Sequence, residues 1–166
     1  MSKRFLNYGS SISPEDHRKC FEEYFAYLKE MQTRFPINAF DFAIADWHWD
    51  ASDPRGPHDA WLDKLEIREV EIEKGSSKRD LVIEARFLGA YHDGYFTLKY
   101  HDVKKYNLDK APLEFPPNFG NGHGDWLIDE VYLSEDGLVI HDIDFANNGR
   151  WTIHCGDLEY TWLPSK

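Results

Sequence analysis

The spacing of apolar residues predicts one amphipathic helix near the start of the chain. From Cys20 onward, apolar side chains recur at steps of three and four residues, which is the period of an α-helix. Ser13 followed by Pro14 is typical of a helix start, and Pro36 ends the pattern. We therefore expect a helix over about residues 14–35, with this apolar face in the core: Cys20, Phe21, Tyr24, Phe25, Leu28, Met31 and Phe35.

Beyond the helix the apolar period changes to two, which predicts β-strands. Phe40, Phe42 and Ile44 alternate with other residues, so the β-rich part is expected to span about residues 37–163. The segments 50–59 and 109–124 are rich in proline and glycine and are expected to be loops. The remaining expected strands are 61–73, 81–87, 96–100, 127–133, 138–145, 151–155 and 158–162.

The last four of these strands follow one another closely, which predicts an antiparallel meander. A three-residue loop over 147–149, with Gly149 in the left-handed conformation, keeps apolar residues on one face. A phase slip between Ile67 and Val70 also predicts a bulge in the first long strand. The loop predicts four cross-strand pairs: Phe145 with Trp151, Ile143 with Ile153, His141 with Cys155, and Asp142 with His154.

These elements define an α+β domain of mostly antiparallel strands, about eight in number, with one N-terminal amphipathic helix. We expect a curved sheet or a two-layer sandwich, with the helix on one face or at one end. The length of 166 residues is typical of one domain, so a single domain over 1–166 is expected.

Charge narrows the classes of partner. The chain carries 30 acidic and 19 basic side chains, a net charge of −11. Such a surface repels the phosphates of nucleic acid and attracts cations or a basic protein. We therefore expect no nucleic-acid partner, while the oligomeric state stays open.

Two further observations bear on location and redox chemistry. The chain has no apolar run long enough to span a membrane and no signal-peptide pattern at its N-terminus, so a cytoplasmic, non-membrane protein is expected. The two cysteines, Cys20 and Cys155, lie on apolar faces and are expected to be small buried side chains rather than a disulfide framework.

The segment Asp46-Trp47-His48-Trp49-Asp50 offers two candidate sites. In an extended conformation Asp46, His48 and Asp50 would share one face, and with His58 nearby they could hold a divalent cation. No other cofactor is expected. The alternatives are a polar strand face opposite a tryptophan core, or a partner-binding patch formed by Trp47, Trp49, Asp53 and Asp59.

Histidine precedes aspartate four times, at 58–59, 92–93, 101–102 and 141–142. Adjacent side chains on a strand point to opposite faces, so such a pair cannot act as one ligand set, and we interpret the pairs as sheet-edge and turn residues. His141 lies on an apolar face and is expected to be a hydrogen-bonded core residue. The sequence holds no motif of a nucleophilic enzyme or a phosphate loop, so no catalytic residue is assigned.

The segments around His58-Asp59-Ala60, His92-Asp93-Gly94 and His123-Gly124-Asp125, followed by Glu130, resemble a pattern of small uncharacterised bacterial proteins. This resemblance covers about residues 36–163, and the chain is similar to small acidic α+β proteins found among the immunity proteins of bacterial polymorphic toxin systems. This resemblance implies a non-enzymatic, acidic inhibitor of a basic toxin domain. The alternatives are a metal- or small-ligand-binding protein or enzyme using Asp46, His48 and Asp50, and a structural or assembly protein.

Overall fold

The helices and strands are defined by a computed structural model, which describes residues 4–6, 12–112 and 120–166. The helical elements all precede the strands. They are the α-helices α1 (Pro14–Met31) and α2 (Ile37–Ile44) and the short 3-10 helices η1 (Gln32–Arg34) and η2 (Asp46–Trp49). The strands are β1 (Trp61–Glu71), β2 (Arg79–Leu88), β3 (Gly94–His101), β4 (Lys105–Asp109), β5 (Trp126–Leu133), β6 (Val139–Phe145), β7 (Arg150–Cys155) and β8 (Asp157–Pro164).

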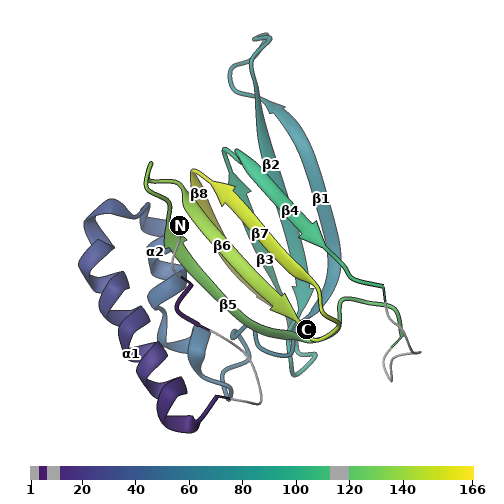
Figure 1. Ribbon diagram of the computed structural model, residues 1–166. Helices are drawn as coiled ribbons and strands as arrows, with labels where there is room; N and C mark the ends of the chain where they lie inside the picture. Colours follow the sequence, from purple (N-terminus) through teal and green to yellow (C-terminus); the bar gives the residue numbers. More distant parts are fainter. Residues whose placement is uncertain (1–3, 7–11, 113–119) are drawn as a thin grey trace.

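The strands form two antiparallel sheets of four strands each, in the orders β1-β2-β3-β8 and β4-β7-β6-β5. Figure 1 shows the second sheet lying in front of the first. Their facing sides meet through aromatic rings, since Phe87 of β2 lies 5.1 Å from Trp126 of β5 and 5.9 Å from Trp151 of β7. The expected α+β fold, with eight antiparallel strands and an N-terminal helix, is confirmed.

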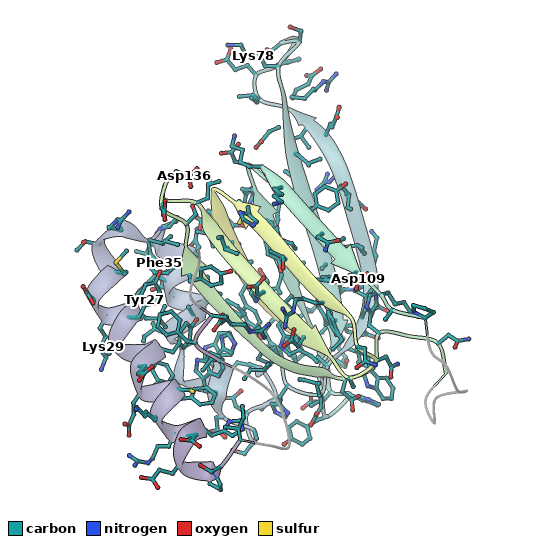
Figure 2. The ribbon with its side chains drawn as sticks, in the orientation of Figure 1. Tyr27, Lys29, Phe35, Lys78, Asp109 and Asp136 are labelled. Carbon is teal, nitrogen blue, oxygen red and sulfur yellow. The ribbon has the colours of Figure 1, made fainter. Side chains whose placement is uncertain are left out.

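Helix α1 follows the predicted pattern and covers the edge strand β5 (Figure 1). Tyr24 and Leu28 are fully buried on its inner face. The Tyr24 hydroxyl accepts from the backbone N–H of Val131 at 2.8 Å and donates to the carbonyl of the same residue at 2.9 Å. Figure 2 shows Tyr27 directed from α1 toward the sheet and Lys29 directed away from it. The Tyr27 hydroxyl also accepts from a backbone N–H of β5, that of Leu133. Two tyrosines of α1 therefore form hydrogen bonds with backbone groups of β5 that would lack partners at the edge of the sheet.

The expected strand after the helix is wrong, because residues 37–44 form α2 and residues 46–49 form η2. The β-rich part therefore begins at Trp61 rather than near residue 37. A short apolar run fits a buried helix as well as a strand, and α2 is apolar around much of its circumference. Asp157 of β8 fixes the start of α2, since its carboxylate accepts from the Ala39 backbone N–H and the Asn38 amide.

The C-terminal meander ends one strand earlier than expected. Strands β5, β6 and β7 are consecutive neighbours, but β8 crosses to the other sheet and pairs with β3. Strand β4, whose polar residues gave no alternating pattern, was not predicted and pairs with β7. The bulge in β1 lies between Leu62 and Lys64 rather than between Ile67 and Val70.

The hairpin between β6 and β7 has the expected faces but a register shifted by two residues. Ile143 lies opposite Trp151, and Asp142 lies opposite Thr152 instead of His154. The three-residue loop is 146–148, and Asn148 rather than Gly149 has the positive φ of 59°. Asparagine tolerates the left-handed conformation, so either residue satisfied the turn rule and the sequence could not separate them.

A glycine at the start of β3 is required by the close approach of β8. A Cβ atom on Gly94 would lie 2.8 Å from the Leu163 carbonyl oxygen and closer still to the Trp162 ring. We expect Gly94→Ala to lower the free energy of unfolding by about 1 to 3 kcal/mol, because the two strands would have to separate. Urea unfolding measures this, with Gly122→Ala as the control since a Cβ there meets only an atom at 3.8 Å. Equal stability of the two variants would contradict the close packing.

Candidate functional site

A carboxylate buried between the sheets is the centre of the most polar part of the core. Asp129 of β5 is 1% exposed. It faces the other sheet because the pairing of β5 with β6 is irregular between Trp126 and Ile128. This irregularity places Trp126 and Asp129 on the same face, and the Trp126 indole donates to Asp129 Oδ1 at 3.1 Å.

Two histidines from distant parts of the chain complete the surroundings of Asp129. Nε2 of His48, from η2, lies 2.9 Å from Oδ1, and Nε2 of His141, from β6, lies 2.9 Å from Oδ2. Both histidines are buried, with exposures of 3% and 0%. We call Asp129, His48, His141 and Tyr100 the buried network, since the Tyr100 hydroxyl lies 2.9 Å from Nδ1 of His141.

The hydrogen bonds define the charges within the buried network. Nδ1 of His48 faces the Phe42 carbonyl oxygen at 2.8 Å, and that oxygen can only accept. His48 therefore donates from both nitrogens, as an imidazolium does, to the carbonyl and to Asp129. Burial alone would raise the pKa of Asp129, but the charge of His48 and the hydrogen bonds from both histidines hold it well below its usual range.

Aromatic rings surround His48. The Trp49 ring lies parallel to it at 4.2 Å with an interplanar angle of 4°, and the Phe42 ring lies at 4.4 Å. The faces of aromatic rings carry partial negative charge and attract cations. The rings and Asp129 thus both stabilise a positive charge on His48 inside the core.

His141 links Asp129 to Tyr100. It donates from Nε2 to Asp129, and its Nδ1 shares a hydrogen bond of 2.9 Å with the Tyr100 hydroxyl, whose pKa is raised well above its usual value by burial. The expectation of a satisfied core histidine is confirmed. Every ring nitrogen of His48 and His141 has a partner within the protein, so neither histidine offers a free base for proton transfer.

A pocket of about 260 Å³ opens beside the buried network. It lies between the first turns of α1, the segment after η2 and the start of β5. Its walls are mostly apolar, and the imidazoles of His17 and His58 add polar groups. The lining residues are His17, Phe21, His48, Trp49, Ala51, Pro57, His58, Trp126, Leu127, Ile128 and Asp129.

The predicted metal face of Asp46, His48 and Asp50 does not form. These residues are not extended, because η2 turns His48 into the core while Asp46 and Asp50 stay exposed. Both ring nitrogens of His48 form hydrogen bonds within the protein. His58 lies on the pocket wall, with its Nδ1 3.3 Å from Oδ2 of Asp59. Within the ranges 4–6, 12–112 and 120–166, no group of three or more histidine, cysteine, aspartate or glutamate residues is arranged to hold a metal ion.

The predicted partner-binding residues are separated into two positions. Trp49 lines the pocket, and Asp59 is exposed next to it. Trp47 packs instead against Tyr160 at 4.4 Å, with the Arg55 guanidinium 5.7 Å from its ring. Asp53 is held by that same guanidinium through two hydrogen bonds.

The recurring histidine–aspartate pairs are mostly turn residues, as expected. Asp59, His92 and Asp102 have positive φ angles of 56°, 56° and 50°, a conformation that these short polar side chains adopt more readily than most. The fourth pair differs, because His141 and Asp142 both lie in β6, on opposite faces, and both are buried.

Sequence reasoning missed Asp129 and gave Glu130 no role beyond its place in the resemblance pattern. Two carboxylates in the middle of the apolar strand Leu127–Leu133 were the available signal, because acidic residues are rarely fully buried without partners. The cysteines follow the expectation more closely: Cys155 is buried, and burial raises the pKa of its thiol to about 12, while Cys20 is half-buried.

Comparisons with family models, with curated proteins and with solved structures found no match. No helix in the described part of the chain is long and apolar enough to cross a membrane. The class that fold and site define is an α+β protein of two antiparallel sheets, with an aromatic pocket beside a buried histidine–aspartate network.

Proposed function

We propose that this protein is a non-enzymatic binding protein that recognises a basic protein, in the manner of an immunity-type inhibitor of a bacterial toxin. The observation that carries the proposal is the acidic segment, residues 46–59, which contains four aspartates and a single arginine and forms one wall of the aromatic pocket. Charged loops beside aromatic anchor residues are typical of protein-binding surfaces.

The charge of the acidic segment is available to a partner. Asp46, Asp50 and Asp59 are exposed, and Asp53 is the member neutralised by Arg55. The Ser52 hydroxyl and backbone N–H both donate to Asp50 and lower its pKa, so its charge persists at neutral pH. Toxins that act on nucleic acid need a basic surface, and an acidic surface is the complement that would cover it.

The chemistry of the buried network favours binding over catalysis. Its two histidines are fully engaged with Asp129, Phe42 and Tyr100. A general base needs a free lone pair within reach of a substrate proton. The network instead supports the pocket wall by fixing Trp49 and Trp126 around Asp129.

Co-expression with the product of the adjacent gene tests the proposal. We expect the protein to neutralise the toxicity of that product and to bind it, with an association rate that falls about tenfold or more as ionic strength rises. Asp50→Asn combined with Asp59→Asn should slow association, whereas Glu73→Gln with Glu135→Gln, the same charge change at exposed turn positions, should have a much smaller effect. The proposal fails if the wild-type protein neither binds nor neutralises the neighbouring product.

A further inference from the structure

We propose that the pocket between α1, the acidic segment and β5 receives an arginine side chain from the basic partner. This inference rests on the proposed function, because it takes the partner to be a basic protein. It assigns the pocket one occupant, a guanidinium group, and the argument depends on size, ring geometry, hydrogen bonding and charge.

The pocket has the size of a site for one side chain. Its volume of about 260 Å³ lies below the range of roughly 300 to 1,000 Å³ that is typical of small-molecule and cofactor sites. Phe21, Trp49 and Trp126 supply three aromatic rings to its walls. A guanidinium is planar and weakly hydrated and stacks on such rings, whereas an ammonium is strongly hydrated and gains less there.

The carboxylate of Asp129 in the pocket wall keeps an acceptor position that no donor of the described residues occupies. Nδ1 of His58 lies 3.3 Å from the Asp59 carboxylate, which accepts from it. Nε2 of His58 is shielded from solvent and has no hydrogen-bond partner among the described residues. Asp129 accepts three hydrogen bonds, from Trp126, His48 and His141, and a carboxylate has about four acceptor positions. A guanidinium has five donors and no acceptor, which complements this lining.

At the pocket mouth, exposed aspartates favour a cation over an anion, and deeper in the pocket wall the opposite charges of His48 and Asp129 offset each other. Asp59 adjoins His58, and the charge of Asp50 is close enough to His58 for the two to interact. Both aspartates are exposed, so a cation approaching the pocket would not have to displace an existing ion pair of theirs with lysine or arginine. An incoming carboxylate or phosphate would instead meet these two negative charges.

The first experiment tests the pocket without any partner protein. N-acetyl-arginine amide is titrated into the wild-type protein while tryptophan side-chain resonances are followed by NMR, and we expect saturable shifts of Trp49 and Trp126 with a dissociation constant of about 1 to 10 mM. The uncharged isostere N-acetyl-citrulline amide should bind at least about tenfold more weakly. Equal binding of the two compounds, or no saturable shift with the arginine compound, overturns the inference.

A variant that fills the pocket from an exposed position avoids disturbing the core. Ala51 lines the pocket and is exposed, so Ala51→Trp should abolish the shifts caused by the arginine compound while leaving the midpoint of thermal unfolding unchanged. Ala26→Trp, at an exposed site on α1 that does not line the pocket, is the matched control and should bind the compound like wild type. Binding that persists in Ala51→Trp would place the arginine compound elsewhere and overturn the inference.

The partner assay separates this inference from the proposed function. If the neighbouring gene product binds, Ala51→Trp should weaken its affinity about 100-fold or more, the scale of a buried anchor residue, and Ala26→Trp should not. Unchanged affinity in Ala51→Trp would overturn the arginine anchor while the binding function stands. Failure of the function itself has a different signature, since the wild-type protein would then bind the arginine compound but no neighbouring product.

Discussion

Replacing Asp129 by asparagine is expected to lower the free energy of unfolding by about 3 to 5 kcal/mol, one of the largest effects of any single substitution in this protein. The substitution removes the carboxylate that contacts the buried imidazolium of His48, whose side chain is 1% exposed. It also places an amide N–H group where His48, His141 and Trp126 all present donors. The measurement is equilibrium urea unfolding monitored by tryptophan fluorescence.

The control for Asp129 is the same change at an exposed position. Asp93 is exposed in the turn before β3, and Asp93→Asn should change the free energy of unfolding by no more than about 0.5 kcal/mol. The charge of His48 is tested separately by combining Asp129→Asn with His48→Gln. Because the two residues form one ion pair, the double variant should cost less than the sum of the single variants, by about 0.5 to 3 kcal/mol. Strict additivity would show that His48 and Asp129 are not coupled, contrary to the geometry.

The strands were predictable where the alternation of apolar and polar residues was consistent with a strand alone. In β3 the residues Phe96, Leu98 and Tyr100 are buried and the residues between them are not, so period two identified both the strand and its inner face. Helix α1 was equally clear, because its start is fixed locally by Ser13, whose side chain accepts from the Asp16 backbone N–H. Local rules suffice when the nearest residues along the chain determine the element.

The other elements depended on contacts that no local pattern contains. Residues 37–44 alternate like a strand but form α2, which packs on β8 and is anchored there by Asp157. Strand β8 itself looked like the end of a meander, yet it joins the other sheet. Both errors have one cause, because tertiary packing of distant segments outweighs a weak local preference.

The candidate site was only half visible in the sequence. Trp49 and His58 were singled out, and both line the pocket. The reason given for His48 was wrong, since its partner Asp129 is 81 positions away and its ring points into the core. In the sequence, the signal for the pairing of His48 with Asp129 was the unusual position of a carboxylate within an apolar strand.

The second buried carboxylate of β5 has the opposite electrostatic character to Asp129. Glu130 is fully buried on the other face of the strand, where Oε2 accepts from the backbone N–H groups of Phe5 and Leu6 at 2.9 and 2.8 Å. Burial raises its pKa to about 7, although these two hydrogen bonds and the charge of Arg4 act in the opposite direction. Glu130 therefore resists ionisation, whereas Asp129 beside its imidazolium does not.

This raised pKa predicts how stability depends on pH. In the unfolded chain Glu130 loses its proton near pH 4.5, while in the folded protein it keeps the proton up to about pH 7. Between these values the folded state binds more protons than the unfolded state, so the Glu130 contribution to stability is present at low pH and is lost as pH rises toward 7. At about 1.4 kcal/mol for each pH unit, the total loss is about 3 kcal/mol.

Glu130→Gln should remove this dependence, because glutamine stays neutral and its carbonyl oxygen can still accept from Phe5 and Leu6. The variant and the wild-type protein should be about equally stable at pH 4, and the variant should be more stable by about 3 kcal/mol at pH 8. Urea unfolding of both proteins at four pH values measures the difference in their free energies of unfolding. The titration of every other group is the same in both proteins and cancels in this difference.

The control is Glu135→Gln, at an exposed turn position, which should follow the wild-type curve. A constant difference between Glu130→Gln and wild type across this range would mean that the backbone donors and Arg4 offset the burial of the charge, and that Glu130 is ionised in the folded protein.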